Sequence, residues 1–169
     1  MLAEVTTDRL LLRRWREEDE APLAEIYAQP EYLATMPPAD AGAQIEAWER
    51  RWDEDGFGPW AACDRSGGRL IGRIGLLRHH DWALEPDPVE VGWVLHCDYW
   101  GRGLATEGGR ASVAAWREHL SDERLYSFTV PSNVRSRAVM ERLGMRYGGV
   151  TSWRGLHHAW YVLDREESV

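Results

Sequence analysis

Hydrophobic and polar positions alternate in blocks along the chain, and the length of each block predicts a strand or a helix. Short apolar runs bounded by glycine, proline or charged residues predict strands at 9–15, 59–65, 69–77, 89–97, 124–131, 145–153 and 156–164. Apolar residues at helical spacing predict helices at 17–29, 41–56, 102–120 and 133–144. Three prolines interrupt 29–42, so that segment is expected to be irregular, as is the loop at 79–88.

Single residues mark several of these ends. Gly56 and Gly144 follow the last helical position of two helices, and Asn133 can cap the start of the final helix with its side chain. The order is strand, two helices, three strands, helix, strand, helix and two strands. This order predicts one α/β domain over residues 1–169, built on a mixed sheet of about seven strands.

Charge and cysteine content narrow the setting. The formal net charge is −8, whereas a nucleic-acid binder usually presents a basic face, so no nucleic-acid partner is expected. Cys63 and Cys97 lie far apart and outside any C-x-x-C pattern, which favours a reduced, cytoplasmic location. No stretch approaches the roughly 20 apolar residues of a membrane helix, and residues 1–20 do not resemble a secretory signal.

The segment "WGRGLAT", residues 100–106, carries the clearest chemical signal. It follows the strand "VEVGWVLHC" and opens the helix at 102–120. A glycine turn at a helix start exposes backbone N–H groups that have no partner inside the helix, and the helix dipole adds to their attraction for an anion. Gly101 and Gly103 allow close backbone approach, while Arg102 adds a charge and Thr106 a hydroxyl. The pattern predicts a cradle for a pyrophosphate.

Two other glycine templates do not fit. The dinucleotide fingerprint G-x-G-x-x-G/A, read from Gly101, meets Thr106 where Gly or Ala is required. A P-loop read from Gly67 has Arg73 and Ile74 in place of Lys and Ser/Thr. A nucleotide-binding domain of either kind is therefore disfavoured.

Strand, cradle and small-residue helix together resemble the acetyl-CoA-binding motif of the GNAT acetyltransferase superfamily, usually written Q/R-x-x-G-x-G/A. Asp98 stands at the Q/R position and departs from that pattern, whereas Gly101 and Gly103 fit it. The segments "TTDRLLLRRWREEDEAPL", "GGRLIGRIGL", "YWGRGLATEG" and "VPSNVRSRAVMERLGM" are similar to the branch that contains the ribosomal-protein N-terminal acetyltransferases. The similarity covers nearly the whole chain in order.

The resemblance implies a fold, a co-substrate and a set of binding residues. The fold is a single, mostly antiparallel sheet flanked by helices, whose fourth and fifth strands splay apart to admit the pantetheine arm of acetyl-CoA. The implied cofactor-binding residues are Val94, Leu95 and His96 through their main chain, the cradle Gly101, Arg102, Gly103, Leu104, Ala105 and Thr106, and Asn133. The implied reaction is acetyl transfer to a primary amine by direct attack in a ternary complex.

Two residues are expected to be catalytic. Glu90 lies on the strand that leads to the cradle and is the candidate base that neutralises the amine; the competing interpretation is a surface or ion-paired glutamate. Many members carry a thiolate-protonating Tyr where this chain has Met140. Ser136, three residues after Asn133, is the alternative group near the sulfur, unless it only bonds backbone at the helix start. His96 and His158 are auxiliary base candidates.

The sequence gives only general expectations about metal binding, the wall of the cleft, the acceptor and the assembly. The adjacent pairs His79–His80 and His157–His158 lack a metal-ligand spacing, so no metal is expected. Five tryptophans are candidates for the wall of a cleft: Trp15, Trp48, Trp52, Trp82 and Trp153. The acceptor is a protein N-terminal α-amine, a small amine, or an amino acid or amino sugar, and a homodimer is among the expected assemblies. The alternative to an enzyme is a module that binds CoA or a ligand without turnover.

Overall fold

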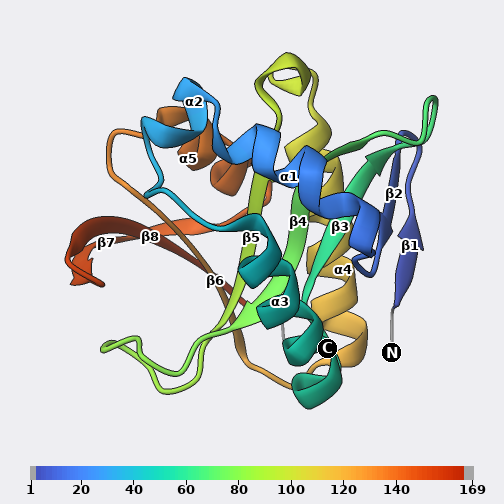
Figure 1. Cartoon of the computed structure of the whole chain (residues 1–169). Helices are drawn as coiled ribbons and strands as arrows, with labels where there is room; N and C mark the ends of the chain where they lie inside the picture. Colours follow the sequence, from blue (N-terminus) through green and yellow to red (C-terminus); the bar gives the residue numbers. More distant parts are fainter. Residues whose placement is uncertain (1–2, 166–169) are drawn as a thin grey trace.

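One twisted sheet runs through the molecule in the computed structural model, which describes residues 3–165 (Figure 1). Its strand order is β1-β2-β3-β4-β5-β6-β8-β7, and every neighbouring pair is antiparallel except β5 and β6. The strands are β1 Glu4–Thr6, β2 Leu10–Arg13, β3 Pro59–Asp64, β4 Leu70–Arg78, β5 Val89–Leu95, β6 Arg124–Thr129, β7 Arg146–Trp153 and β8 Leu156–Asp164.

Helices cover both faces of this sheet. The α-helices are α1 Glu20–Tyr27, α2 Pro30–Leu33, α3 Ala41–Asp55, α4 Leu104–His119 and α5 Val134–Arg142, with short 3₁₀ turns at Glu17–Asp19 and Cys97–Tyr99. Figure 1 shows α1 and α3 crossing one face, while α4 lies behind the other. Each layer has its own apolar core, one under α1 and α3 and a larger one under α4.

The predicted fold class is confirmed, and two elements were missed. β1 is only three residues long and mostly exposed, so it has no apolar run to reveal it. The segment 29–42, predicted to be irregular, contains the four-residue helix α2, which begins with Pro30 at its first helical position. The loop at 79–88 lies where the sequence predicted it. β3 and β4 form one antiparallel hairpin, and β7 and β8 form another around Arg154 and Gly155.

The small residues of α4 let this helix approach the sheet closely. A Cβ on Gly108 would come within 2.5 Å of Ile74 Cδ1 and 3.3 Å of Leu10 Cδ1. Any side chain there would push α4 away from β2 and β4, and with it the glycine turn at the helix start. Gly108 therefore lets the start of α4, and the glycine turn before it, lie close to the sheet.

β5 and β6 pair only where both strands begin. Their parallel register covers Val89 with Leu125 and Glu90 with Tyr126. Beyond Glu90, β5 stays bonded to β4 as far as Leu95, whereas β6 stays bonded to β8. The two strands therefore diverge in the middle of the sheet, as the resemblance implied.

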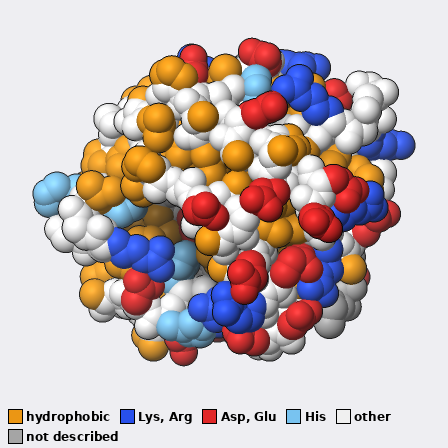
Figure 2. All heavy atoms as spheres, in the orientation of Figure 1, with side chains coloured by type: hydrophobic (Ala, Val, Ile, Leu, Met, Phe, Trp, Pro, Cys, Tyr) orange, Lys and Arg blue, Asp and Glu red, His pale blue; other side chains and the backbone are white. Residues whose placement is uncertain are grey.

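The surface on the α1 and α3 side is mixed in character. Figure 2 shows hydrophobic side chains gathered around a hollow on the left of this face, and acidic and basic side chains interspersed over its lower right. Within residues 3–165, no helix is both long enough and apolar enough to cross a bilayer.

Candidate active site

A large cleft follows the gap between β5 and β6. Its volume is about 1860 Å³, well above the roughly 300–1,000 Å³ of an ordinary ligand pocket, so it is large enough for more than one small ligand. One end is lined by Gly101, Gly103 and the first turn of α4, and the other by His79, Glu90 and the end of the β7–β8 hairpin. Trp93 and Ser136 line the stretch between the two ends.

The glycine turn has the geometry that an anion cradle needs. Gly101 and Gly103 both adopt left-handed backbone conformations, with φ of 70° and 77°. The first internal hydrogen bond of α4 joins the Glu107 N–H to the Gly103 carbonyl, so the amides before Glu107 have no acceptor inside the helix. Gly101, Gly103, Leu104, Ala105 and Thr106 all line the cleft. Because the side chains of Leu104 and Thr106 are buried, mainly their amides are available to a ligand.

Charged side chains next to the cradle hold it to the β1–β2 turn. Glu107 accepts hydrogen bonds from the Thr7 hydroxyl at 2.6 Å, the Arg9 amide at 2.8 Å and the Arg9 Nε at 2.7 Å. Although burial opposes it, these bonds lower the pKa of the Glu107 carboxyl. Arg9 Nη2 lies 3.5 Å from the position of a Cβ on Gly103. Arg102, by contrast, points its guanidinium over the Tyr99 ring, 5.0 Å from the centroid.

The backbone N–H and C=O groups of β5 face β4 and the gap toward β6 in alternation. The His96 N–H donates to the Ile71 carbonyl of β4 at 2.8 Å, and Val94 pairs with Arg73 of β4 two residues earlier. Successive residues of a strand direct their backbone groups to opposite neighbours. The backbone groups of Trp93 and Leu95 therefore face the gap, and the Leu95 carbonyl there accepts the Trp100 indole N–H at 2.9 Å.

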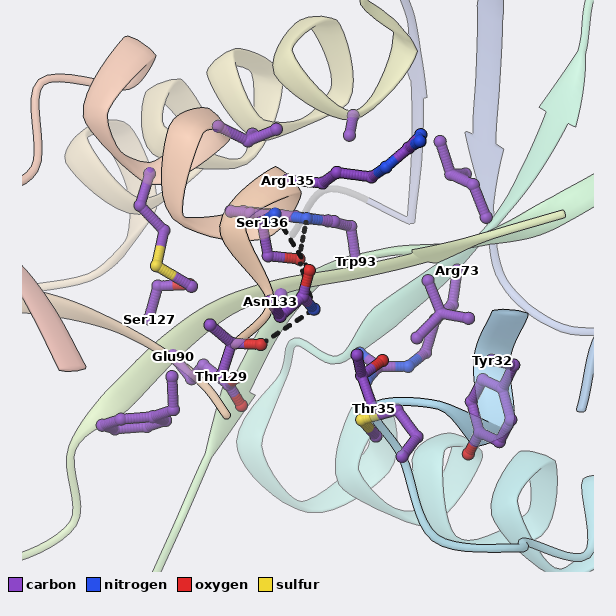
Figure 3. Close-up of a pocket in the computed structure, with 18 of the residues that line it drawn as sticks. Tyr32, Thr35, Arg73, Glu90, Trp93, Ser127, Thr129, Asn133, Arg135 and Ser136 are labelled. Carbon is purple, nitrogen blue, oxygen red and sulfur yellow. Dashed lines mark hydrogen bonds between the residues drawn. The ribbon is translucent and has the colours of Figure 1, made fainter. Parts of the chain in front are cut away.

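Ser136 belongs to a small hydrogen-bonded network on α5 (Figure 3). Asn133 caps this helix by accepting the Ser136 N–H, at 3.2 Å. The Ser136 hydroxyl oxygen accepts the Asn133 amide at 3.1 Å and the Trp93 indole N–H at 3.3 Å, and Asn133 also donates to the Thr129 hydroxyl at 3.0 Å. With its oxygen accepting two bonds, the Ser136 hydroxyl keeps its own hydrogen for another partner.

Glu90 lies opposite this network and is held by a histidine. His79 Nε2 lies 2.6 Å from Glu90 Oε2; the His79 side chain is buried, and 16% of the Glu90 side chain is exposed. The His79 ring packs edge-on against Trp153, with centroids 4.8 Å apart. Glu90 is therefore partnered, as the competing interpretation required, but it also lines the cleft. No local sequence pattern indicates this pair, because it depends on where β4 ends opposite β5.

Some of the other residues predicted to belong to the site line the cleft, and others are buried in the apolar cores. Of the five tryptophans, Trp48 and Trp153 line the cleft, together with Trp93 and Trp100, which were not singled out. Trp15, Trp52 and Trp82 belong to the apolar cores. His158 lines the cleft, whereas His96 Nδ1 accepts the Asp98 N–H at 3.2 Å. The atoms of His96, Cys97 and Asp98 that could ligate a metal ion lie within 4.8 Å of one another; His96 and Cys97 are partly buried and Asp98 is exposed.

Comparison with known proteins identifies the family. A family model described as "Acetyltransferase (GNAT) domain" matches residues 9–146. The uncharacterized protein YkkB of Bacillus subtilis is 26% identical over 151 residues, which are 85% of this chain and 86% of YkkB. The solved acetyltransferase of Agrobacterium tumefaciens is 26% identical with a TM-score of 0.83, covering 98% of this chain and 96% of that one. The ribosomal-protein-S5-alanine acetyltransferase of Vibrio fischeri has the same fold, with a TM-score of 0.77 at 13% identity and 97% of both chains covered.

The chain therefore belongs to the GNAT acetyltransferase family. Members of this family are acyltransferases that use acetyl-CoA and act on amine acceptors. This supports the enzyme over the non-catalytic module that the sequence left open. The cradle fits such a co-substrate, because its left-handed glycines and free helix amides are directed to one end of a cleft that continues past Ser136 to Glu90.

Proposed function

We propose that this protein is an acetyl-CoA-dependent N-acetyltransferase that acetylates a primary amine by direct attack within a ternary complex. The acceptor amine belongs to a protein N-terminus or to a small molecule. The observation that carries the proposal is the opposition of two polar groups across β5, Glu90 held by His79 on one side and Ser136 on the other. A thioester supplies the activated acetyl group when acetyl-CoA is bound.

Acetyl-CoA would be held mainly by backbone groups. The amides of Gly101, Gly103, Leu104, Ala105 and Thr106 would bind the pyrophosphate, with Arg9 close enough to add positive charge. Arg102 points its guanidinium over the Tyr99 ring and would have to turn to reach the phosphates. We assign the main-chain contacts in the gap to Leu95, with Trp93 added, rather than to Val94 and His96, because the His96 amide already donates to Ile71. Asn133 would act by fixing the start of α5 and the position of Ser136.

Glu90 would take a proton from the acceptor. A Lys-like amine has a pKa of about 10.4 and an α-amine about 7.7–8.0, so either is partly or mostly protonated at neutral pH. Glu90 Oε2 is occupied by His79, which leaves Oε1 for an amine or for an intervening water. His79 thus acts as a positioning residue, because its bond and its packing against Trp153 fix the rotamer of Glu90.

Ser136 would serve the leaving sulfur. Its oxygen accepts from Trp93 and Asn133, so its hydroxyl hydrogen is free to donate to the developing thiolate. Met140, at the position where a Tyr is common, is buried and offers no such hydrogen. Glu90 would thus accept the proton of the amine on one side of β5, and Ser136 would donate a hydrogen bond to the sulfur on the other side.

The test is an acceptor screen that reads thiol release and product mass together. We expect thiol release that depends on an amine, with one acetyl group added to it. Acetyl-CoA alone should raise the melting temperature, because a ligand that binds only the folded state stabilises it. Thermal stabilisation without acetylation of any amine would contradict the proposed function and favour the sensing module.

A further inference from the structure

Arg73 is a cation in the middle of an otherwise apolar strand, and it lines the cleft. It pairs with Val94 across β4 and β5, so its side chain lies on the same face of the sheet as Glu90. The side chain is half-buried, with its guanidinium 5.5 Å from the centre of the Trp48 ring. Among residues 3–165, no carboxylate forms an ion pair with Arg73. A half-buried cation that has no ion-pair partner favours an anionic ligand.

Gly92 opens a space between this cation and the candidate base. A Cβ on Gly92 would lie 3.3 Å from Glu90 Oε1 and 3.4 Å from Arg73 Nη1, although the two charged groups do not form an ion pair. The carboxylate and the guanidinium thus face the same point above the strand. A ligand placed there meets a negative group and a positive group at once.

Two tyrosines complete the surroundings of Arg73. Tyr27 and Tyr32 stack with ring centroids 4.7 Å apart, and both interact electrostatically with Arg73. Burial raises the pKa of Tyr27 to about 12, so its hydroxyl stays protonated and can donate to an anion. Figure 3 shows Arg73 and Tyr32 on the side of the pocket away from Glu90 and Ser127.

We infer that the acceptor is a free α-amino acid, whose amine lies at Glu90 Oε1 and whose carboxylate is bound by Arg73. This inference rests on the proposed function and names the substrate class for it. An α-amino acid carries its ammonium and carboxylate groups on one carbon atom, which matches the two opposite charges that meet above Gly92. The side chain of the acceptor then has an aromatic ring available near each charged group, Trp48 beside Arg73 and Trp153 beside His79.

The other acceptors that the family admits suit this arrangement less well. A polyamine would bring a second positive charge toward Arg73, which is repulsive at short range. A peptide N-terminus has an amide where the amino acid has its carboxylate, and would leave the Arg73 charge unmatched. Arg73 therefore separates free amino acids from peptides by charge alone.

The experiment compares matched acceptors by mass. The twenty amino acids are offered beside their α-carboxamides, together with short peptides and polyamines. We expect at least one free acid to be acetylated with kcat/KM about 10- to 100-fold above that of its carboxamide, the range for one charge-assisted hydrogen bond. The same or higher activity with the carboxamides would overturn the inference, as would acetylation of peptides or polyamines alone.

Variants connect the preference to Arg73. Arg73→Gln should raise KM for the acid about 10- to 100-fold and leave the carboxamide unchanged, so the preference disappears. Arg69→Gln makes the same change on an exposed residue of the same hairpin and should keep the preference. Gly92→Ala fills the space between Glu90 and Arg73 and should raise KM for the acid without changing the acetyl-CoA affinity. A preference that survives Arg73→Gln would also overturn the inference.

Failure of the inference can be told from failure of the proposed function. If amines without a carboxylate are acetylated and free amino acids are not, the enzyme is an N-acetyltransferase and only the substrate class is wrong. If acetyl-CoA binds and no amine in the panel is acetylated, the proposed function fails and the inference fails with it. The melting temperature with acetyl-CoA shows in either case that the variants are folded.

Discussion

The two sides of β5 are built in different ways. On the side of α4 and α5, the candidate cofactor site uses backbone groups, namely the glycine turn, the helix amides and the unpaired edge of the strand. On the side of α1 and α3, the candidate acceptor site uses side chains from separate segments, among them Tyr27, Arg73, His79 and Trp153. A backbone-lined site tolerates many side chains, whereas a side-chain-lined site changes with each substitution. The cofactor side thus suits a shared co-substrate, and the acceptor side suits one particular amine.

The largest effect should come from removing the base on the acceptor side. Glu90→Gln keeps the shape but cannot accept a proton, and general-base assistance is typically worth about 10² to 10⁴ in rate. We expect kcat to fall by at least about tenfold at neutral pH. The deficit should shrink as the pH rises, because more of the amine is then already neutral. Rate profiles of variant and wild type that coincide from low to high pH would remove Glu90 from the mechanism.

The next effect concerns the backbone cradle and should appear in binding. Gly103→Val introduces a side chain at the helix start and should weaken acetyl-CoA binding about 10- to 100-fold, as lost charge-assisted hydrogen bonds would. Gly56→Val is the matched control, because Gly56 has φ of 78°, close to the 77° of Gly103, has no atom within 4 Å of its missing Cβ, and ends a helix outside the cleft. Calorimetry would contradict the cradle if both variants bound acetyl-CoA like the wild type.

A smaller effect is expected where the two sides meet at Ser136. Ser136→Ala removes the free hydroxyl hydrogen and should lower kcat about 2- to 10-fold, with acetyl-CoA affinity nearly unchanged. Ser112→Ala also deletes a buried hydroxyl, but one that bonds Gly108 within α4, and should leave kcat unchanged. Equal kcat in the two variants would limit the Ser136 hydroxyl to a structural role, as the acceptor for Trp93 and Asn133 at the start of α5.

The smallest effect should come from His79, which acts through Glu90. His79→Leu should lower kcat about 2- to 5-fold, because Glu90 loses the bond that fixes its rotamer. His79→Gln keeps an N–H donor near the same place and should restore part of the loss. Steady-state rates of the two variants check this, and a loss of equal size in both would indicate a packing role against Trp153.

The same division explains what the sequence could predict. Gly101, Gly103 and Asn133 lie in short contiguous segments where the residue type itself dictates a turn or a cap, so the cradle could be predicted from local sequence. The pairing of His79 with Glu90 depends on the register of β4 against β5, and the space above Gly92 depends on side-chain rotamers. Neither the pair nor the space can be recognised from neighbouring residues in the sequence. Arg73 can be recognised, because a charged residue within an apolar strand is unusual unless it serves a site.

The strands of the sheet also differ in how well the sequence predicts them. The strands with apolar runs were predicted, whereas β1 is too short and too exposed to produce a run. Its role is visible only in three dimensions, where the turn that follows it at Thr7 holds Glu107 beside the cradle. Long-range contacts of this kind decide which loop lies next to which site, and a single sequence does not encode them in any one segment.

The most direct test of the central claim, that amine and acetyl donor meet across β5 in one complex, is the initial-velocity pattern with both substrates varied. Direct attack predicts reciprocal plots that intersect, and an unmodified protein mass after incubation with acetyl-CoA alone. Parallel plots together with an acetylated protein would show a covalent enzyme intermediate. That result would contradict the arrangement of Glu90 and Ser136 as partners in a single transfer step.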